Sequence, residues 1–367
     1  MNITVLGAGS GACAAAVDLK LRGFNVEMCS TFQPDVETNL NAIEESGGIR
    51  YHGCLGDGFV DIDTSYDPYA LKKSDLIMIV TIAAGYEHYA RTCGRYFEPG
   101  QTIFLSPGYI GGSIQFQNLL KSEIVDNGHQ GRPYICESNN LAFVCRQLRP
   151  GEVRIFRKTK YLTLGVLPSM HSFEVFDIVR QVYPFMNLAD NVLESGMLNP
   201  NLVLHPAGMV MNAGWIESTG GNFNYYSQGI TPAVARVMEA FEEERLAICN
   251  ALGVKTLDFL RYYKESGYTS PEASGIYEAV RFSEPNKDIR APPSLDHRYL
   301  SEDVGFGLVP LRAIAKIANV RTEVIDALIH LSSALTGVDY FKEGLSAEKM
   351  GIDGMSTEAF LSLVKRG

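Results

Sequence analysis

A glycine-rich turn at the start of the chain constrains the fold more than any other feature of the sequence. An apolar run, Ile3 to Leu6, precedes this turn, and an alanine-rich segment follows it. The small residues have the G-x-G-x-x-G/A spacing at the point where a strand would pass into a helix. Such a turn lets the backbone approach a pyrophosphate, and the helix N-terminus binds the phosphates. The sequence therefore predicts a dinucleotide site rather than a plain turn, with contacts from Gly7, Gly9, Ser10, Gly11 and Ala12.

The end of the second predicted strand, Gly23 to Ser30, bears on which dinucleotide binds. It lies roughly 20 residues past the turn, where an Asp or Glu normally holds the ribose 2′-hydroxyl. Here the strand ends in Ser30 and Thr31. The missing carboxylate removes the repulsion that excludes a 2′-phosphate, although no Arg or Lys follows before Arg50 to bind one. We therefore slightly favour NADP(H) over NAD(H), with Ser30 and Thr31 beside the ribose.

Two further apolar runs, Ser74 to Thr81 and Gln101 to Pro107, predict central parallel strands. Ligands of such sheets collect at the carboxyl ends of the strands, so the small residues after each run should lie beside the cofactor rather than form connecting turns only. The expected contacts are Thr81, Ile82, Ala83, Pro107 and Gly108. More strands are expected at Tyr134 to Glu137 and at Val153 to Val166, where several basic residues indicate a solvated face.

Beyond Pro168 the pattern changes from strand-like runs to helical periodicity. A chain of 367 residues is long for one core, so two domains are the default expectation. We predict an α/β fold, with a Rossmann doubly wound parallel sheet in residues 1–168 and a mainly α-helical substrate domain in residues 169–367. Charged residues from Glu242 to Arg245 are expected to form a solvated helix face. Helices are expected at Ser172 to Tyr183, from Thr231–Pro232 to Gly253, near Leu311 to Ala318 and at Glu323 to Leu335.

The bulk composition excludes several classes of protein. Hydrophobic residues make up 46% of the chain and charged residues 20%, which is ordinary for a folded globular protein. A net charge of −10 argues against binding to nucleic acid or a membrane surface, and no apolar run approaches the roughly 20 residues of a membrane helix. Seven scattered cysteines without a C-x-x-C pair indicate neither a disulfide framework nor a metal site. We expect a cytoplasmic protein without a secretory signal, whose partners are small molecules.

Histidine is the first residue type to consider for moving a proton to or from a substrate. Of seven histidines, His205 has the most suggestive surroundings, an apolar stretch from Asn199 to Asn212 that is rich in small residues. If this stretch is a helix, Asn201, His205 and Gly208 share one face, with a gap at the glycine that a ligand could enter. A buried histidine bonded to backbone beside Pro206 explains these residues equally well.

A second segment, Leu295 to Pro310, combines many ionisable residues with a glycine-flexed apolar stretch. One interpretation is an exposed loop with an Arg298–Glu302 pair. Asp303 argues against this interpretation, because it falls on the apolar side of the segment. A carboxylate that approaches a core usually has an imidazole or guanidinium partner. His205 is an attractive partner for it.

These polar segments resemble the opine dehydrogenases, the octopine and carboxyethyl-amino-acid dehydrogenase group. The most specific match is Arg298-Tyr-Leu-Ser-Glu-Asp-Val304, and the resemblance extends from the Gly7 turn to Gly344. Members of this family condense the amino group of an amino acid with a 2-oxo acid, often pyruvate, and reduce the imine with NAD(P)H. The other matching segments are Asn201 to Gly208, Tyr226 to Pro232, Glu243 to Ile248 and Gly307 to Pro310.

The resemblance implies roles for three polar residues of these segments. His205 would be the acid/base residue, held by Asp303, and Arg298 would bind a substrate carboxylate. Independently of the resemblance, we place Asn201 in the substrate site because it shares the helix face of His205, and Tyr226 as an aromatic residue of the amino-acid pocket, although core packing explains Tyr226 at least as well. The substrates would be an amino acid and a 2-oxo acid, and a homodimer stays open as the assembly.

Two other functions stay open at this point. A two-domain 2-hydroxy-acid dehydrogenase or ketoacid reductase needs no amine and usually depends on a lysine of its helical domain. A pairing of His205 with Asp303 argues against it. A non-catalytic dinucleotide-sensing protein would keep the Gly7 turn but lose the polar constellation, which this sequence retains.

Overall fold

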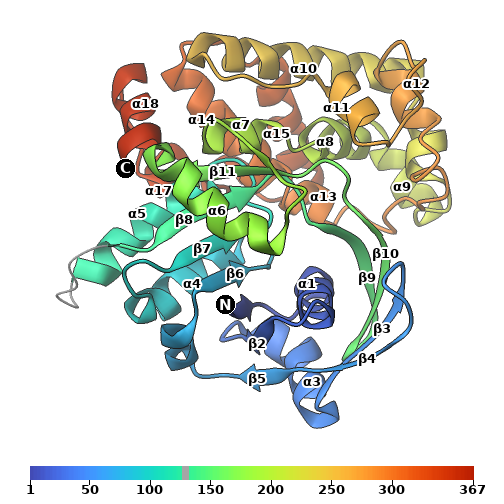
Figure 1. Cartoon of the computed structure of the whole chain (residues 1–367). Coiled ribbons are helices and arrows are strands. Elements are labelled where there is room, and N and C mark those ends of the chain that lie inside the picture. Colours follow the sequence, from blue (N-terminus) through green and yellow to red (C-terminus); the bar gives the residue numbers. More distant parts are fainter. Residues whose placement is uncertain (126–131) are drawn as a thin grey trace. The chain divides into compact units, whose positions relative to one another are not determined.

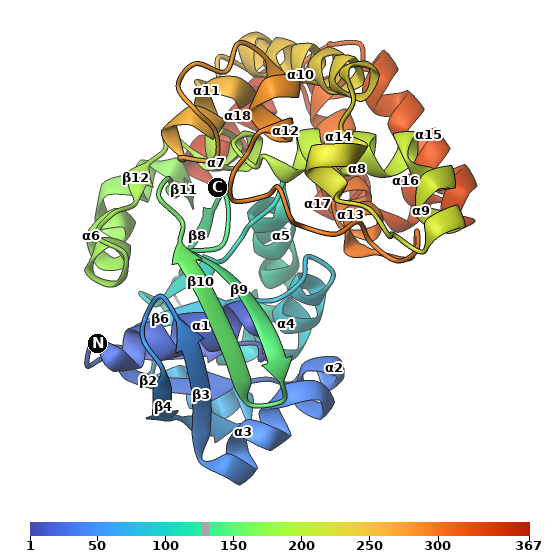
Figure 2. The same cartoon turned by 90° about the vertical axis from the view of Figure 1, so that its right-hand side faces the viewer.

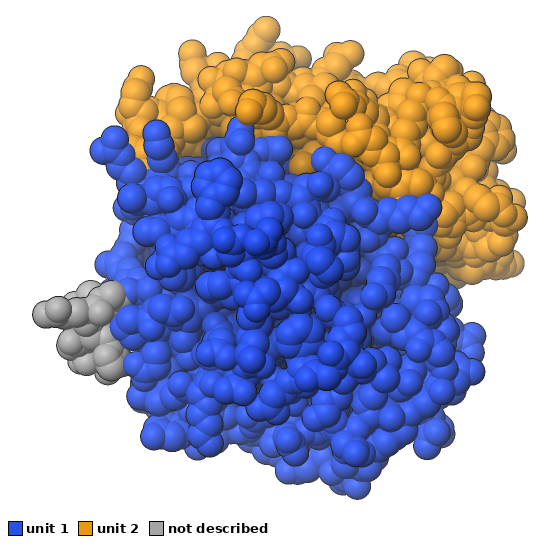
Figure 3. Space-filling view, viewed as in Figure 1, with its two compact units in different colours: residues 1–195, 364–367 blue, residues 196–363 orange. Residues whose placement is uncertain are grey.

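The computed structural model describes residues 1–125 and 132–367 and divides them into two compact units. The first unit contains Met1–Ser195 together with Val364–Gly367, and the second contains Gly196–Leu363. Figure 3 colours the two units separately. Among the helices of the described residues, none is long and apolar enough to cross a membrane.

The first unit is built on an eight-stranded sheet with the order β12-β11-β8-β7-β6-β1-β2-β5 (Figure 1). Neighbouring strands from β8 to β5 are parallel, whereas β11 runs antiparallel to β8. Strands β6 and β7 are buried along their whole length, because they are apolar on both faces. This confirms the doubly wound parallel sheet predicted for the N-terminal half. The strands span Asn2–Leu6 (β1), Asn25–Cys29 (β2), Asp63–Ser65 (β5), Leu76–Ile79 (β6), Thr102–Leu105 (β7), Tyr134–Ser138 (β8), Thr163–Leu167 (β11) and Asn187–Leu188 (β12).

Helix α1, Ser10–Leu21, is packed between this sheet and a second, four-stranded sheet with the order β4-β3-β10-β9 (Figure 2). Eight consecutive residues from Ala12 to Leu19 are buried, which explains the run of small side chains after the glycine turn. The predicted strand at Val153 to Val166 is in fact two strands, β10 and β11, one in each sheet. Along β10, Arg154 is exposed between buried neighbours, so the solvated face is confirmed. The second sheet consists of Gly48–Gly53 (β3), Gly58–Asp61 (β4), Phe143–Arg149 (β9) and Glu152–Lys158 (β10).

The division of the chain differs from the predicted boundary after Pro168. The structure divides it between Ser195 and Gly196. Helical periodicity from Ser172 onward suggested a new domain, but helix α6, Ser172–Val182, is the crossover to β12, which pairs parallel with β11. A crossover helix carries the same apolar stripe as a bundle helix, so periodicity does not distinguish the two.

The second unit is built from helices, as the sequence predicted. Helix α10, Pro232–Leu252, begins where Thr231 Oγ1 accepts a hydrogen bond of 3.4 Å from Val234 N–H. It ends at Gly253, whose φ of +65° suits the left-handed cap of a helix. In both units of the described chain, the other α-helices are Gln33–Asp35 (α2), Asn41–Ser46 (α3), Gly85–Cys93 (α4), Gly112–Val125 (α5), Val192–Met197 (α7), Asn201–Met211 (α8), Ala213–Thr219 (α9), Phe259–Glu265 (α11), Ile276–Arg281 (α12), Arg298–Ser301 (α13), Val309–Ile317 (α14), Glu323–Thr336 (α15), Tyr340–Glu343 (α16), Ala347–Met350 (α17) and Thr357–Arg366 (α18).

The charged segment of α10 corrects the prediction of a solvated face. Glu242 and Arg245 are only 7% and 2% exposed. The Arg245 guanidinium donates to both carboxylate oxygens of Glu242, at 2.7 and 2.6 Å. It also donates to the carbonyl oxygens of Met197 and Leu257, at 2.7 and 2.9 Å. Charge spacing alone suggests exposure, but an ion pair can be buried when hydrogen bonds satisfy it in this way.

Removing one charge of this pair should destabilise the second unit. Glu242→Gln leaves the Arg245 guanidinium buried without its counter-charge, so we expect the free energy of unfolding to fall by about 3–5 kcal/mol. Chemical denaturation followed by circular dichroism measures this change. The exposed neighbour Glu243 gives the control, because Glu243→Gln should change the same quantity by less than about 0.5 kcal/mol. Equal effects of the two substitutions would show that the buried pair does not stabilise the fold.

Candidate active site

The glycine-rich turn between β1 and α1 has the geometry of a dinucleotide-binding turn. Gly7 has a φ of +119°, and a Cβ there would lie 2.4 Å from the Val80 carbonyl oxygen, so only glycine fits. Gly9 directly precedes α1, and the space around a Cβ built on it is open. Ala12 is fully buried, which lets the helix lie close to the sheet. The three small residues thus have the distinct surroundings that the fingerprint requires.

Ser10 and Gly11 hold the first turn of α1 against neighbouring segments. The Ser10 hydroxyl accepts a hydrogen bond of 2.9 Å from the backbone N–H of Gln147 in β9. A Cβ on Gly11 would lie 3.1 Å from side-chain atoms of Leu141 and Val80. Both residues therefore have a packing role besides the phosphate contact that the sequence predicts.

The predicted contacts from the strand ends lie at one edge of the sheet. Thr81 to Ala83 come shortly after β6, and Pro107 and Gly108 come shortly after β7. Ile82 is 50% exposed and accessible to a ligand, whereas Ala83 is buried. Gly108 is needed for packing, because a Cβ there would lie 2.3 Å from the Cβ of Glu137.

Glu137 is a buried carboxylate at this edge that was not among the predicted site residues. It is 0% exposed and accepts hydrogen bonds from Ser195 Oγ at 3.0 Å and from Ser113 N–H at 3.3 Å. Burial raises the pKa of Glu137 to about 7. Ser113 lies in the first turn of α5, where the helix dipole favours negative charge. Glu137 lies near the carboxyl end of β8, and this position is the sequence signal that could have indicated it.

The structure buries Ser30, which the sequence predicts beside the ribose. Ser30 is 0% exposed, and its hydroxyl shares a hydrogen bond of 2.8 Å with Tyr89 Oη. It also accepts a hydrogen bond of 3.1 Å from Phe32 N–H. Thr31 is half-buried, and its hydroxyl contacts His88 Nε2 at 3.0 Å. The Ser30 side chain is therefore used within the protein.

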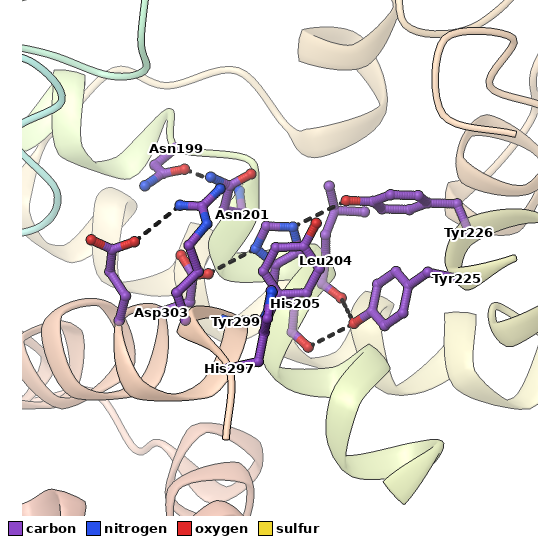
Figure 4. A network of polar contacts seen from close by, with 11 residues as sticks. Asn199, Asn201, Leu204, His205, Tyr225, Tyr226, His297, Tyr299 and Asp303 are labelled. Atoms are coloured by element: carbon purple, nitrogen blue, oxygen red, sulfur yellow. Dashed lines mark hydrogen bonds and ion pairs between the residues drawn. The ribbon is translucent and has the colours of Figure 1, made fainter. Parts of the chain in front are cut away.

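In the second unit, the structure brings Asp303 and Tyr226 into direct contact with His205, one at each ring nitrogen (Figure 4). His205 Nδ1 lies 2.7 Å from Asp303 Oδ2, and His205 Nε2 lies 3.1 Å from Tyr226 Oη. The exposed fractions of His205 and Asp303 are 3% and 1%. Tyr299 stacks on the imidazole, with ring centroids 3.5 Å apart and an angle of 11° between the planes. The imidazole is thus fixed at both nitrogens and on one ring face.

Glycines allow the segments that carry this cluster to approach one another. His205 lies in α8, and a Cβ on Gly208 would lie 2.2 Å from Tyr225 Oη. The space left by Gly208 admits the Tyr225 hydroxyl, which donates to the His205 carbonyl oxygen at 3.0 Å. Asp303 directly precedes a π-helical turn, and a Cβ on Gly307 in that turn would lie 2.4 Å from the Leu202 side chain. The glycine-flexed stretch noted in the sequence thereby brings Asp303 to α8.

The surroundings of His205 keep its imidazole neutral at pH 7. Burial lowers its pKa from the ordinary value of 6.5, and the Arg298 charge lowers it further, while the Asp303 carboxylate acts in the opposite direction. The carboxylate at Nδ1 favours the tautomer with the proton on that nitrogen, so Nε2 accepts a hydrogen bond from the Tyr226 hydroxyl. Burial and the neighbouring Arg298 and His205 also lower the pKa of His297 to about 4.

The other two predicted substrate residues begin the helices that carry the cluster. Arg298 is the first residue of α13, its side chain is 55% exposed, and its Nη1 lies 3.0 Å from Glu302 Oε2. Asn201 is the first residue of α8, is half-buried, and donates its backbone N–H to Asn199 Oδ1 at 3.0 Å.

Within the described part of the chain, no group of three or more His, Cys, Asp and Glu side chains could hold a metal ion.

Comparisons with known proteins match both the helical unit and the whole chain. The family described as NAD/NADP octopine/nopaline dehydrogenase, alpha-helical domain, matches residues 188–336. An opine dehydrogenase of Arthrobacter sp. (strain 1C) is 34% identical over 366 residues, which cover 98% of each chain. Among solved structures, octopine dehydrogenase in complex with NADH and agmatine has a TM-score of 0.81 at 19% identity and covers 100% of this chain and 98% of its own. Yersinopine dehydrogenase with bound NADP+ has a TM-score of 0.70 at 14% identity, with the same coverage.

The structural matches show that the fold is shared, and the sequence match extends this relationship over nearly the full length of both chains. The recognised segment includes the whole of the His205, Tyr226 and Asp303 cluster. The resemblance found in the sequence is thereby confirmed, and the chain belongs to the opine dehydrogenase family, a family of NAD(P)-dependent oxidoreductases that act on CH–NH groups.

Proposed function

We propose that this protein reductively joins the amino group of an amino acid to a 2-oxo acid, with pyruvate as the expected oxo acid, and catalyses the reverse reaction. The observation that carries the proposal is the buried contact of His205 Nδ1 with Asp303 Oδ2 in a chain related over its length to an opine dehydrogenase. We also propose a cytoplasmic location and small-molecule partners, as predicted from the sequence. A homodimer stays open.

A nicotinamide dinucleotide fits the turn between β1 and α1. The open space at Gly9 would let a pyrophosphate approach the backbone, and the N-terminus of α1 would bind its charge. Thr81 to Ala83, with Pro107 and Gly108, would line the cofactor. When bound, the reduced nicotinamide supplies the hydride that reduces the imine carbon. The slight preference for NADP(H) expected from the sequence rests on Ser30 beside the ribose, and a Ser30 hydroxyl bonded to Tyr89 gives it no support.

His205 would move the protons that imine formation requires. Its neutral Nε2 can accept a proton from the ammonium group of the amino acid, which makes the amine nucleophilic. The resulting imidazolium can donate the same proton to the hydroxyl group that leaves the carbinolamine as water. The Asp303 carboxylate at Nδ1 stabilises this imidazolium and fixes the ring orientation. The lowered pKa of His205 suits the first step, because the ring is neutral before the substrate binds.

Three residues around the imidazole would position the substrates. Arg298 presents a planar guanidinium whose paired N–H donors match a carboxylate. Tyr226 places its hydroxyl beside Nε2, where the proton is exchanged. Asn201 begins the same helix as His205 and supplies an amide that can donate and accept.

The proposal predicts that cofactor oxidation requires both substrates together. NADH and NADPH oxidation would be followed with pyruvate alone, with each amino acid alone and with the two combined. We expect oxidation only in the combined assays, with a secondary amine as the product, because the imine is the species reduced. Oxidation with pyruvate alone would instead support a 2-hydroxy-acid dehydrogenase. Cofactor binding without any oxidation would support a dinucleotide sensor.

Replacing the imidazole should abolish most of the turnover. We expect His205→Ala to lower kcat by about a hundredfold or more, because general acid–base catalysis contributes on that scale. Cofactor affinity, measured by fluorescence titration, should stay unchanged. The matched control is His330→Ala, since His330 is an exposed histidine of the same unit. Full activity of the His205 variant would remove this residue from the mechanism.

The carboxylate partner should control the protonation of the imidazole. Asp303→Asn removes the interaction that raises the His205 pKa against burial, so this pKa should fall further below its ordinary value. The ring would then stay neutral to lower pH than in the unsubstituted protein. Imidazole resonances followed by NMR during a pH titration measure the shift, and His205→Ala identifies the resonance. The control is Glu217→Gln, which removes an exposed carboxylate of the same unit and should leave the His205 pKa unchanged.

A further inference from the structure

A carboxylate that the spacing of the sequence did not indicate lies against the glycine-rich turn. Asp35 ends the short helix α2, and its Oδ2 accepts a hydrogen bond of 3.2 Å from the backbone N–H of Ala8. Ala8 lies between the first two glycines of the fingerprint. A Cβ built on Gly7 would lie 3.5 Å from the same carboxylate oxygen. Asp35 is half-buried and in contact with the segment that would bind the dinucleotide.

Tyr89 connects this carboxylate to the residue at the expected acid position. Its hydroxyl shares a hydrogen bond of 2.8 Å with Ser30 Oγ and lies 3.4 Å from Asp35 Oδ2. The serine at the end of β2 therefore supports a tyrosine that in turn contacts the carboxylate. Within the described part of the chain, no Lys or Arg forms an ion pair with the Asp35 carboxylate, and burial raises the pKa of this carboxyl above its ordinary value while the hydrogen bonds from Ala8 and Tyr89 lower it.

The position of this charge matters for the adenosine half of the cofactor. In a Rossmann unit the adenosine ribose lies between the first glycine of the turn and the end of the second strand, where an acid accepts hydrogen bonds from the ribose hydroxyls. Asp35 reaches this place from beyond the end of β2, because the chain turns back toward Ala8 after Phe32. The 2′-phosphate of NADP(H) would be repelled here by the negative charge of the Asp35 carboxylate. It would also replace the 2′-hydroxyl, which in NAD(H) can donate a hydrogen bond to that carboxylate.

We propose that Asp35 binds the adenosine ribose and selects NAD(H) over NADP(H). The proposal rests on the function proposed above, because it assumes that the turn binds a nicotinamide dinucleotide. It reverses the slight preference for NADP(H) that the sequence alone favours. It also gives Ser30 a different part, since Ser30 supports Tyr89 and does not face the ribose.

Direct binding measurements on the full chain test the assignment. Isothermal titration with NADH and with NADPH gives the dissociation constants for the unsubstituted protein, Asp35→Asn and Glu37→Gln. Asp35→Asn keeps an oxygen that can accept from Ala8 N–H and removes only the charge. Glu37 is an exposed carboxylate two residues away, so its substitution is the matched control.

We expect the unsubstituted protein to bind NADH at least about tenfold more tightly than NADPH, because hydrogen bonds to a charged group contribute on that scale. Asp35→Asn should reduce this ratio about tenfold or more, and Glu37→Gln should leave it unchanged. Tighter binding of NADPH by the unsubstituted protein would overturn the assignment. So would an equal weakening of both dinucleotides in Asp35→Asn, because that result indicates a purely structural carboxylate. Failure of the unsubstituted protein to bind either dinucleotide would overturn the proposed function as well.

Discussion

The arrangement of the candidate site depends on one buried contact, between His205 Nδ1 and Asp303 Oδ2. Both side chains are almost completely removed from water, so an unpaired carboxylate in this place would cost far more than at the surface. The contact requires the segment after α13 to approach α8 closely, and Gly307 permits this approach because any side chain there would meet Leu202. The pair therefore explains the local fold, and it also fixes which nitrogen of the neutral imidazole carries the proton.

The two units meet different chemical requirements by similar means. In the first unit, Gly7 and Gly9 leave the backbone exposed at the start of α1, where N–H groups and the helix dipole favour an anion. In the second unit, Gly208 and Gly307 let polar side chains enter an apolar core and meet there. Glycines thus leave the backbone open to phosphates in the first unit. In the second unit they let neighbouring segments pack closely around a buried imidazole.

Features that depend on neighbouring residues could be predicted from the sequence, and features that depend on distant partners could not. The turn at Gly7 and the caps of α10 are local, and both were predicted correctly. The burial of Ser30 depends on Tyr89. The carboxylate near Ala8 comes from Asp35, outside the usual spacing. The charges of α10 have the same spacing whether they meet water or one another, so only the structure distinguishes a solvated face from a buried ion pair. The contact of His205 with Asp303 was expected on two grounds: Asp303 falls on the apolar side of its segment and so needs a partner, and the family resemblance implies the same pair.

The central claim is that His205 and Asp303 act as one proton-transferring unit, and a double-mutant cycle on kcat tests it most directly. His205→Ala and Asp303→Asn would be measured singly and together in amine-dependent cofactor oxidation. If Asp303 acts through the imidazole, the double variant should be no more than about threefold slower than His205→Ala alone. If the loss in the double variant equals the product of the two single losses, the residues act independently and the account is wrong.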